Sequence, residues 1–127
     1  MAPARPRRGD QVPPPAKDGE WELRYATKSS LALIEMEKQF PGNVAEAKAR
    51  LKTAPTTRSS AQKRLRDVLG TRVINGVVMD QWQIDISSSA RLWYCVDEDA
   101  HVVWLTLAAG GHPRATEAKG KKPPRNR

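Results

Sequence analysis

The chain has one cysteine, no long apolar run and no cluster of metal-binding side chains. With Cys95 as the only cysteine among 127 residues, no disulfide can form within the chain, which fits a reducing cytoplasm. No run approaches the roughly 18 apolar residues of a membrane-spanning helix, and the basic, proline-rich N-terminus lacks the apolar core of a signal peptide. No Gly-rich phosphate loop or nucleophile elbow is present. We therefore predict no membrane association, no metal and no cofactor.

Positive charge is in excess, with a formal net charge of +8 at pH 7, and it is unevenly spread. Residues 48–72 hold eight Lys or Arg and one acid, and residues 112–127 hold six and one. Residues 73–111 hold one Arg and five acids. Charge sorted in this way favours a polyanionic partner, although basic helix faces and a solvated tail would give the same pattern.

The length suits one domain with tails. Residues 1–19 form a Pro/Arg-rich leader that contains three consecutive prolines, which disfavour helix, and we expect it to be disordered. Residues 118–127 form a basic tail, also expected to be disordered. The folded domain is then predicted to span residues 20–117.

The first half of this domain predicts a strand followed by two helices. Residues 20–26 alternate between apolar and polar side chains, as a half-buried strand does. Thr27 can cap a helix that runs to about Phe40, where Pro41-Gly42 ends it. Asn43 can cap a second helix, with Glu46 completing a capping box. The apolar stripe of that helix is Val44, Ala47 and Leu51, with Lys48, Arg50 and Lys52 predicted on its other sides.

The C-terminal third predicts a meander. Three alternating segments, residues 81–87, 91–96 and 101–108, are joined by connections too short for a parallel crossover, so the strands must be antiparallel. Asn75-Gly76 is a further hairpin signal that leaves the number of strands open. The predicted fold is α+β: β-α-α-β-β-β, with one more strand possible, as an antiparallel twisted sheet carrying an αα-hairpin on one face.

This order of elements, together with Arg91-Leu92-Trp93-Tyr94 and the segment Gly111-His112-Pro113-Arg114-Ala115-Thr116-Glu117, resembles the RelE/ParE superfamily of bacterial toxins from type II toxin–antitoxin systems. The resemblance covers roughly residues 20–117 and is strongest to an actinobacterial branch that ends Gly-His-Pro-Lys/Arg-Ala-Thr-Glu. It implies one of two activities: metal-independent cleavage of mRNA on the ribosome, as in RelE-like members, or inhibition of DNA gyrase, as in ParE-like members. In both cases a cognate antitoxin is the implied protein partner.

Metal-free RNA cleavage requires proton transfer and cations that stabilise the charged phosphate. His112 has a side chain suited to proton transfer near neutrality, and the planar guanidinium of Arg91 suits a phosphate. The resemblance gives catalytic roles to these two positions. The residues expected to contact phosphates or to stack on a base are Lys63, Arg64, Arg66, Arg114 and Trp93.

Other interpretations of the same residues stay open. Arg91 can pair with Asp85 across the hairpin, and His112 can be an ordinary turn residue. No carboxylate is clearly placed as a partner for His112, so a general base is not assigned. Gyrase inhibition without nuclease activity, or a non-catalytic basic module that binds RNA or DNA, therefore stay as alternatives.

Overall fold

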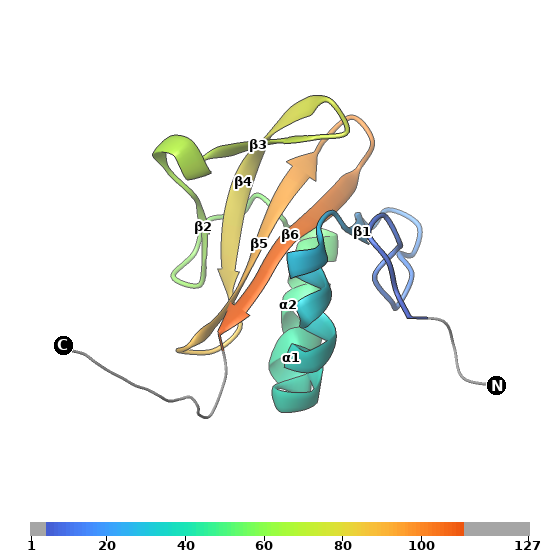
Figure 1. Cartoon of the computed structure of the whole chain (residues 1–127), viewed down its shortest axis with the longest axis vertical. Coiled ribbons are helices and arrows are strands. Elements are labelled where there is room, and N and C mark those ends of the chain that lie inside the picture. Colours follow the sequence, from blue (N-terminus) through green and yellow to red (C-terminus); the bar gives the residue numbers. More distant parts are fainter. Residues whose placement is uncertain (1–4, 111–127) are drawn as a thin grey trace.

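The computed structural model describes residues 5–110. They form a twisted, open, six-stranded sheet and two adjacent α-helices (Figure 1). The strands are β1 (Glu22–Tyr25), β2 (Gln62–Arg64), β3 (Thr71–Ile74), β4 (Val77–Asp85), β5 (Ala90–Asp97) and β6 (Val102–Gly110). The helices are α1 (Leu33–Gln39) and α2 (Pro41–Thr53), with short 3₁₀ helices η1 (Lys28–Ala32) and η2 (Asp67–Leu69). The predicted α+β class is confirmed.

The strand order is β1-β6-β5-β4-β2. Strands β4, β5 and β6 form the predicted antiparallel meander. Strand β1, however, pairs with β6 in parallel, so the sheet is mixed rather than wholly antiparallel. A short turn dictates the direction of the next strand, whereas β1 and β6 are separated by most of the chain and no turn constrains their pairing.

Strands β2 and β3 settle the open question of the strand count. The backbone carbonyl of Gln81 accepts from the N–H of Leu65, and the backbone N–H of Gln81 donates to the carbonyl of Gly70. Strands β2 and β3 therefore lie one after the other along the same edge of β4. The turn of the β3–β4 hairpin is Asn75-Gly76, and both residues have positive φ, 52° and 81°. This left-handed geometry is the one that Asn-Gly favours in a two-residue hairpin.

The first helical turn and helix α2 begin at residues of different kinds, Thr27 and Pro41. As predicted, Thr27 caps the first helical turn, with its side chain accepting from the N–H of Ser30. The predicted Asn43 cap of the second helix is wrong, because α2 already begins at Pro41. The fixed φ of proline suits the first helical position, where no N–H is needed. The amide of Asn43 instead donates to the carbonyl of Ile86, which ties α2 to the end of β4.

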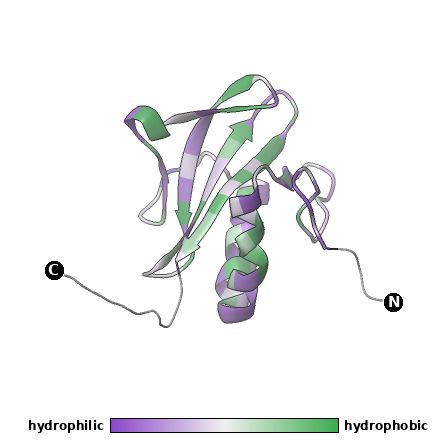
Figure 2. Cartoon of the chain, viewed as in Figure 1, coloured by the Kyte–Doolittle hydropathy of each residue, from purple (hydrophilic) through white to green (hydrophobic). Residues whose placement is uncertain are grey.

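The main core lies between the two helices and one face of the sheet, which we call the helix-covered face. The predicted stripe of Val44, Ala47 and Leu51 is buried there. Figure 2 shows hydrophobic residues recurring along both helices and alternating with polar ones along the strands. The buried strand residues of this core are Leu23, Tyr25, Trp82, Ile84, Ala90, Leu92, Tyr94, Val96, Val103, Leu105 and Ala108.

The leader was expected to be disordered, but its described part packs on the domain. The N–H of Val12 donates to the carbonyl of Leu23, and the N–H of Tyr25 donates to the carbonyl of Asp10, so this segment runs along the free edge of β1. The Val12 side chain is fully buried and joins the main core. Paired backbone and one buried valine thus outweigh the entropy of a proline-rich segment.

Two lysines of α2 hold this leader in place. Lys48 and Lys52 were predicted to lie on the outer sides of the helix, yet both are buried. The Lys48 ammonium donates to the carbonyl of Pro13 and pairs with Glu37, and the Lys52 ammonium donates to the carbonyl of Pro14. Prolines supply acceptors but no N–H donors, so lysine side chains are suitable partners for this segment.

Candidate nucleic-acid interface

The opposite side of the sheet carries no helix, and we call it the helix-free face. Its residues alternate with those of the main core, because successive strand residues point to opposite faces. Gln83 of β4 stands opposite Trp93 of β5, which stands opposite Leu107 of β6. One row further along, Asp85 stands opposite Arg91. This face is therefore a mixture of charged, amide and indole groups.

Arg91 and Trp93 are brought together as the sequence predicts. Arg91 is exposed and Trp93 is half-buried, two residues apart on the same face of β5. The Trp93 indole N–H donates to the Gln83 side-chain oxygen at 2.9 Å, and the Gln83 amide donates to the Asp85 carboxylate at 3.0 Å. This short network fixes the indole while leaving the Arg91 guanidinium accessible.

The end of β6 lies beside Arg91. Gly110 is the register partner of Ala90, and Ala109 is the partner of Arg91. At Gly110 φ is +90°, and an added Cβ would lie 1.9 Å from the backbone oxygen of Ser89, so only glycine fits this position. The described part of β6 therefore ends next to Arg91. The predicted site residues His112 and Arg114 lie outside the described residues.

The basic segment 63–66 is not one surface. Lys63 is exposed and is the register partner of Gln83, which places it on the helix-free face with Trp93. Arg64 is the register partner of Trp82, on the other face, and its guanidinium pairs with Asp80 at 2.8 Å. Arg66 is exposed at the start of η2. Adjacent strand residues point to opposite faces, so Lys63 lies on the helix-free face and Arg64 does not.

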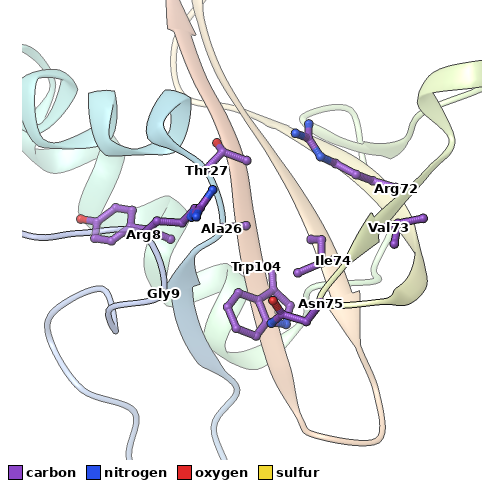
Figure 3. Close-up of a pocket in the computed structure, with 10 residues that line it drawn as sticks. Arg8, Gly9, Ala26, Thr27, Arg72, Val73, Ile74, Asn75 and Trp104 are labelled. Atoms are coloured by element: carbon purple, nitrogen blue, oxygen red, sulfur yellow. The ribbon is translucent and has the colours of Figure 1, made fainter.

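A cavity of about 480 Å³ opens on the helix-free face between β1, β3 and β6 (Figure 3). Its wall includes Trp104 of β6, Asn75 of the β3–β4 turn and Thr27 after β1. Arg8 of the leader and Arg72 of β3 extend toward it from opposite sides. None of the ten residues that line it is acidic.

Sequence reasoning missed this cavity. Arg72 lies close to the Asn-Gly turn, and the alternation from that turn places it opposite Met79, a signal that could have been used. Arg8 gave no signal, because it reaches the cavity only through the pairing of the leader with β1. A contact between residues this far apart in sequence leaves no local pattern.

A small second core lies beneath the cavity. Cys95 is fully buried and packs with Ile74 and Met79, against the half-buried Trp104. Burial raises the pKa of the Cys95 thiol to about 12, which outweighs the opposing effect of the nearby Arg72. The thiol therefore stays protonated near neutrality and is a packing group rather than a nucleophile.

Two further side chains with chemically active groups, His101 and Tyr94, have packing roles. His101 stacks on Trp21, with ring centroids 4.0 Å apart, at the turn before β6. Tyr94 is buried in the main core, and its hydroxyl donates to the carbonyl of Pro55 and accepts from the Gln62 amide.

Within residues 5–110, no group of three or more His, Cys, Asp or Glu side chains is placed to hold a metal ion. In the same part of the chain no helix has the length and apolar character needed to cross a membrane. Comparisons of the chain with models of protein families, with curated proteins and with solved structures find no match. A function must therefore be argued from the residues themselves.

Proposed function

We propose that this chain is a toxin of the RelE/ParE type that acts in the cytoplasm as a metal-independent, ribosome-dependent mRNA endonuclease. The observation that carries the proposal is the position of Arg91. It is exposed on the helix-free face, on the same side of β5 as Trp93 and opposite Ala109, three residues before His112 in the sequence.

Arg91 would bind the phosphate at which the RNA is cut. A guanidinium group presents two parallel N–H donors, which match two phosphate oxygens and stabilise the charge that develops as the 2′-oxygen attacks. Trp93 would offer the face of its indole to a neighbouring base, and Lys63 adds positive charge in the same row of the sheet. Arg66 and Arg114 would contribute further phosphate contacts, whereas the pairing of Arg64 with Asp80 argues against such a role for Arg64.

His112 would transfer the proton. Its ordinary pKa lies near neutrality, so it can give a proton to the leaving 5′-oxygen or take one from the 2′-hydroxyl. Asp85, the register partner of Arg91, is the carboxylate nearest to this part of the sheet in the pairing pattern.

A cognate antitoxin is the protein partner that this proposal requires. Several large apolar side chains are exposed around the β3–β4 hairpin, a region that Figure 2 shows as hydrophobic. They are Val68, Leu69, Val73, Val77 and Val78. Exposed apolar patches of this kind mark protein–protein contacts, so the hairpin is the surface on which we expect the antitoxin to pack.

Induced expression in a bacterial host tests the activity. We expect translation to stop and primer extension to reveal in-frame cuts in mRNA, and we expect Arg91→Ala and His112→Ala each to reduce cutting by about 100-fold. Arg50→Ala is the matched control, because Arg50 is an exposed arginine on α2, away from this face. Double-strand DNA breaks with intact mRNA would instead support gyrase inhibition, and an absence of any growth effect would overturn both.

A further inference from the structure

We propose that the cavity between β1, β3 and β6 is a nucleotide subsite, in which Arg8 and Arg72 hold a phosphate of single-stranded RNA and Trp104 packs against its base. The proposal rests on the proposed function only for the identity of the ligand. The cavity itself is an independent observation, at the other end of the helix-free face from Arg91.

The two cavity arginines are available to a ligand. Among the described residues, no hydrogen bond or salt bridge engages the guanidinium of Arg8 or Arg72. Arg24, by contrast, is held by Glu22 and by the carbonyl of Gly9, and Arg64 is held by Asp80. Two guanidinium groups that converge on a cavity without a lining acid form a site for an anion (Figure 3).

The cavity wall selects an anion that carries an aromatic group. Trp104 is half-buried, and its indole N–H is buried without a hydrogen-bond partner among the described residues. An aromatic ring beside an arginine pair is the combination that binds a base together with its phosphate. At about 480 Å³ the cavity also falls within the range of small-molecule sites, roughly 300–1,000 Å³, and exceeds what a phosphate alone requires.

The distance between Trp104 and Arg91 favours a single strand of RNA, rather than one free nucleotide, as the ligand that would contact both. Trp104 is the register partner of Cys95, and Arg91 lies four residues from Cys95 along β5. At about 3.3 Å per residue, the two positions are separated by roughly 13 Å. One phosphate cannot contact both, whereas successive nucleotides of a single strand can. The subsite would thus fix the register of the RNA relative to Arg91.

Fluorescence polarisation with a labelled uridine hexanucleotide tests the subsite without ribosomes. We expect Arg8→Ala and Arg72→Ala each to weaken binding about tenfold, since each removes a charge-assisted hydrogen bond to phosphate, while Arg50→Ala stays within about twofold of the wild type. In NMR spectra, the indole N–H signal that disappears in Trp104→Phe should shift on addition of the hexanucleotide. Melting curves establish that each variant is folded.

Each other outcome overturns the subsite. Wild-type affinity in both Arg8→Ala and Arg72→Ala would show that the cavity does not bind the RNA. Equal losses of affinity in these two variants and in Arg50→Ala would show that binding is general charge attraction. Competition by uridine 3′-monophosphate as effective as that by the hexanucleotide would indicate a free-nucleotide site, and equal competition by inorganic phosphate would indicate a simple anion site.

The proposed activity fails separately from the subsite. Hexanucleotide binding that depends on Arg8 and Arg72, in a protein that does not cut mRNA on the ribosome, would leave the subsite standing and remove the nuclease proposal. Cutting of mRNA that is lost in Arg91→Ala but unchanged in Arg72→Ala would support the nuclease proposal and remove the subsite.

Discussion

The two faces of the sheet use the same strands for different purposes. On the helix-covered face, Tyr94 and Leu105 have no solvent exposure and Leu92 has 1%. On the helix-free face of the same strands, Trp93 and Trp104 are half-buried and Arg91 is exposed. The first face provides the stability that the second requires, because half-buried indoles and exposed guanidinium groups contribute little to a core.

The largest expected difference between the two faces is in the effects of substituting two neighbouring residues of β5, Leu92 and Arg91. Leu92→Ala removes a buried side chain from the main core and is expected to lower the free energy of unfolding by about 2–5 kcal/mol. Arg91→Ala, one residue earlier and on the other face, is expected to change it by no more than about 0.5 kcal/mol while reducing mRNA cutting by about 100-fold. Urea denaturation measures the first quantity and primer extension the second.

The comparison would break if the two variants behaved alike. A substantial loss of stability in Arg91→Ala would mean that the guanidinium supports the fold, for example through Asp85, its cross-strand neighbour. Its role in cutting RNA would then be inseparable from its role in folding.

The leader provides a smaller effect on the helix-covered side. Val12 is fully buried in the main core, so Val12→Ala should lower the free energy of unfolding by about 1.5 kcal/mol, the value of roughly two buried methylene groups. Arg7→Ala is the control, because Arg7 is exposed and contacts Asp10 through its backbone N–H. Urea midpoints that are equal in the two variants would show that the leader does not belong to the core.

Local patterns in the sequence predict the parts of this fold that local physics determines. Alternation and short turns gave β4, β5 and β6 in the correct order and direction, and Asn75-Gly76 gave the β3–β4 turn. The parallel pairing of β1 with β6 and the packing of the leader could not be found in this way. Both depend on contacts between distant segments, for which no turn or periodicity provides a signal.

The same division applies to the candidate site. Arg91 and Trp93 share a face because they are two residues apart in one strand, so period-two alternation suffices to group them. Lys63 and Arg64 are adjacent in sequence and both are expected to contact phosphates, but in the strand their side chains lie on opposite faces. Clustering of charge along the sequence thus shows that basic residues are present in this strand, but not which face of the sheet each of them occupies.

The smallest expected effect distinguishes the buried part of the helix-free face from its exposed part. The raised pKa of Cys95, about 12 against an ordinary value near 9, means that the folded protein retains a thiol proton which the unfolded chain loses above pH 9. The unfolded state therefore binds fewer protons in this window, and stability is full below pH 9 and falls as the pH rises toward 12. Urea midpoints measured between pH 8 and 9.5, below the ordinary tyrosine pKa of 10, should decline in the wild type and decline less in Cys95→Ala. If the urea midpoint falls equally with pH in the wild type and in Cys95→Ala, the thiol is as accessible to water in the folded protein as in the unfolded chain. That result would contradict a packed layer beneath the cavity. Trp104 would then lack the rigid support that base binding requires.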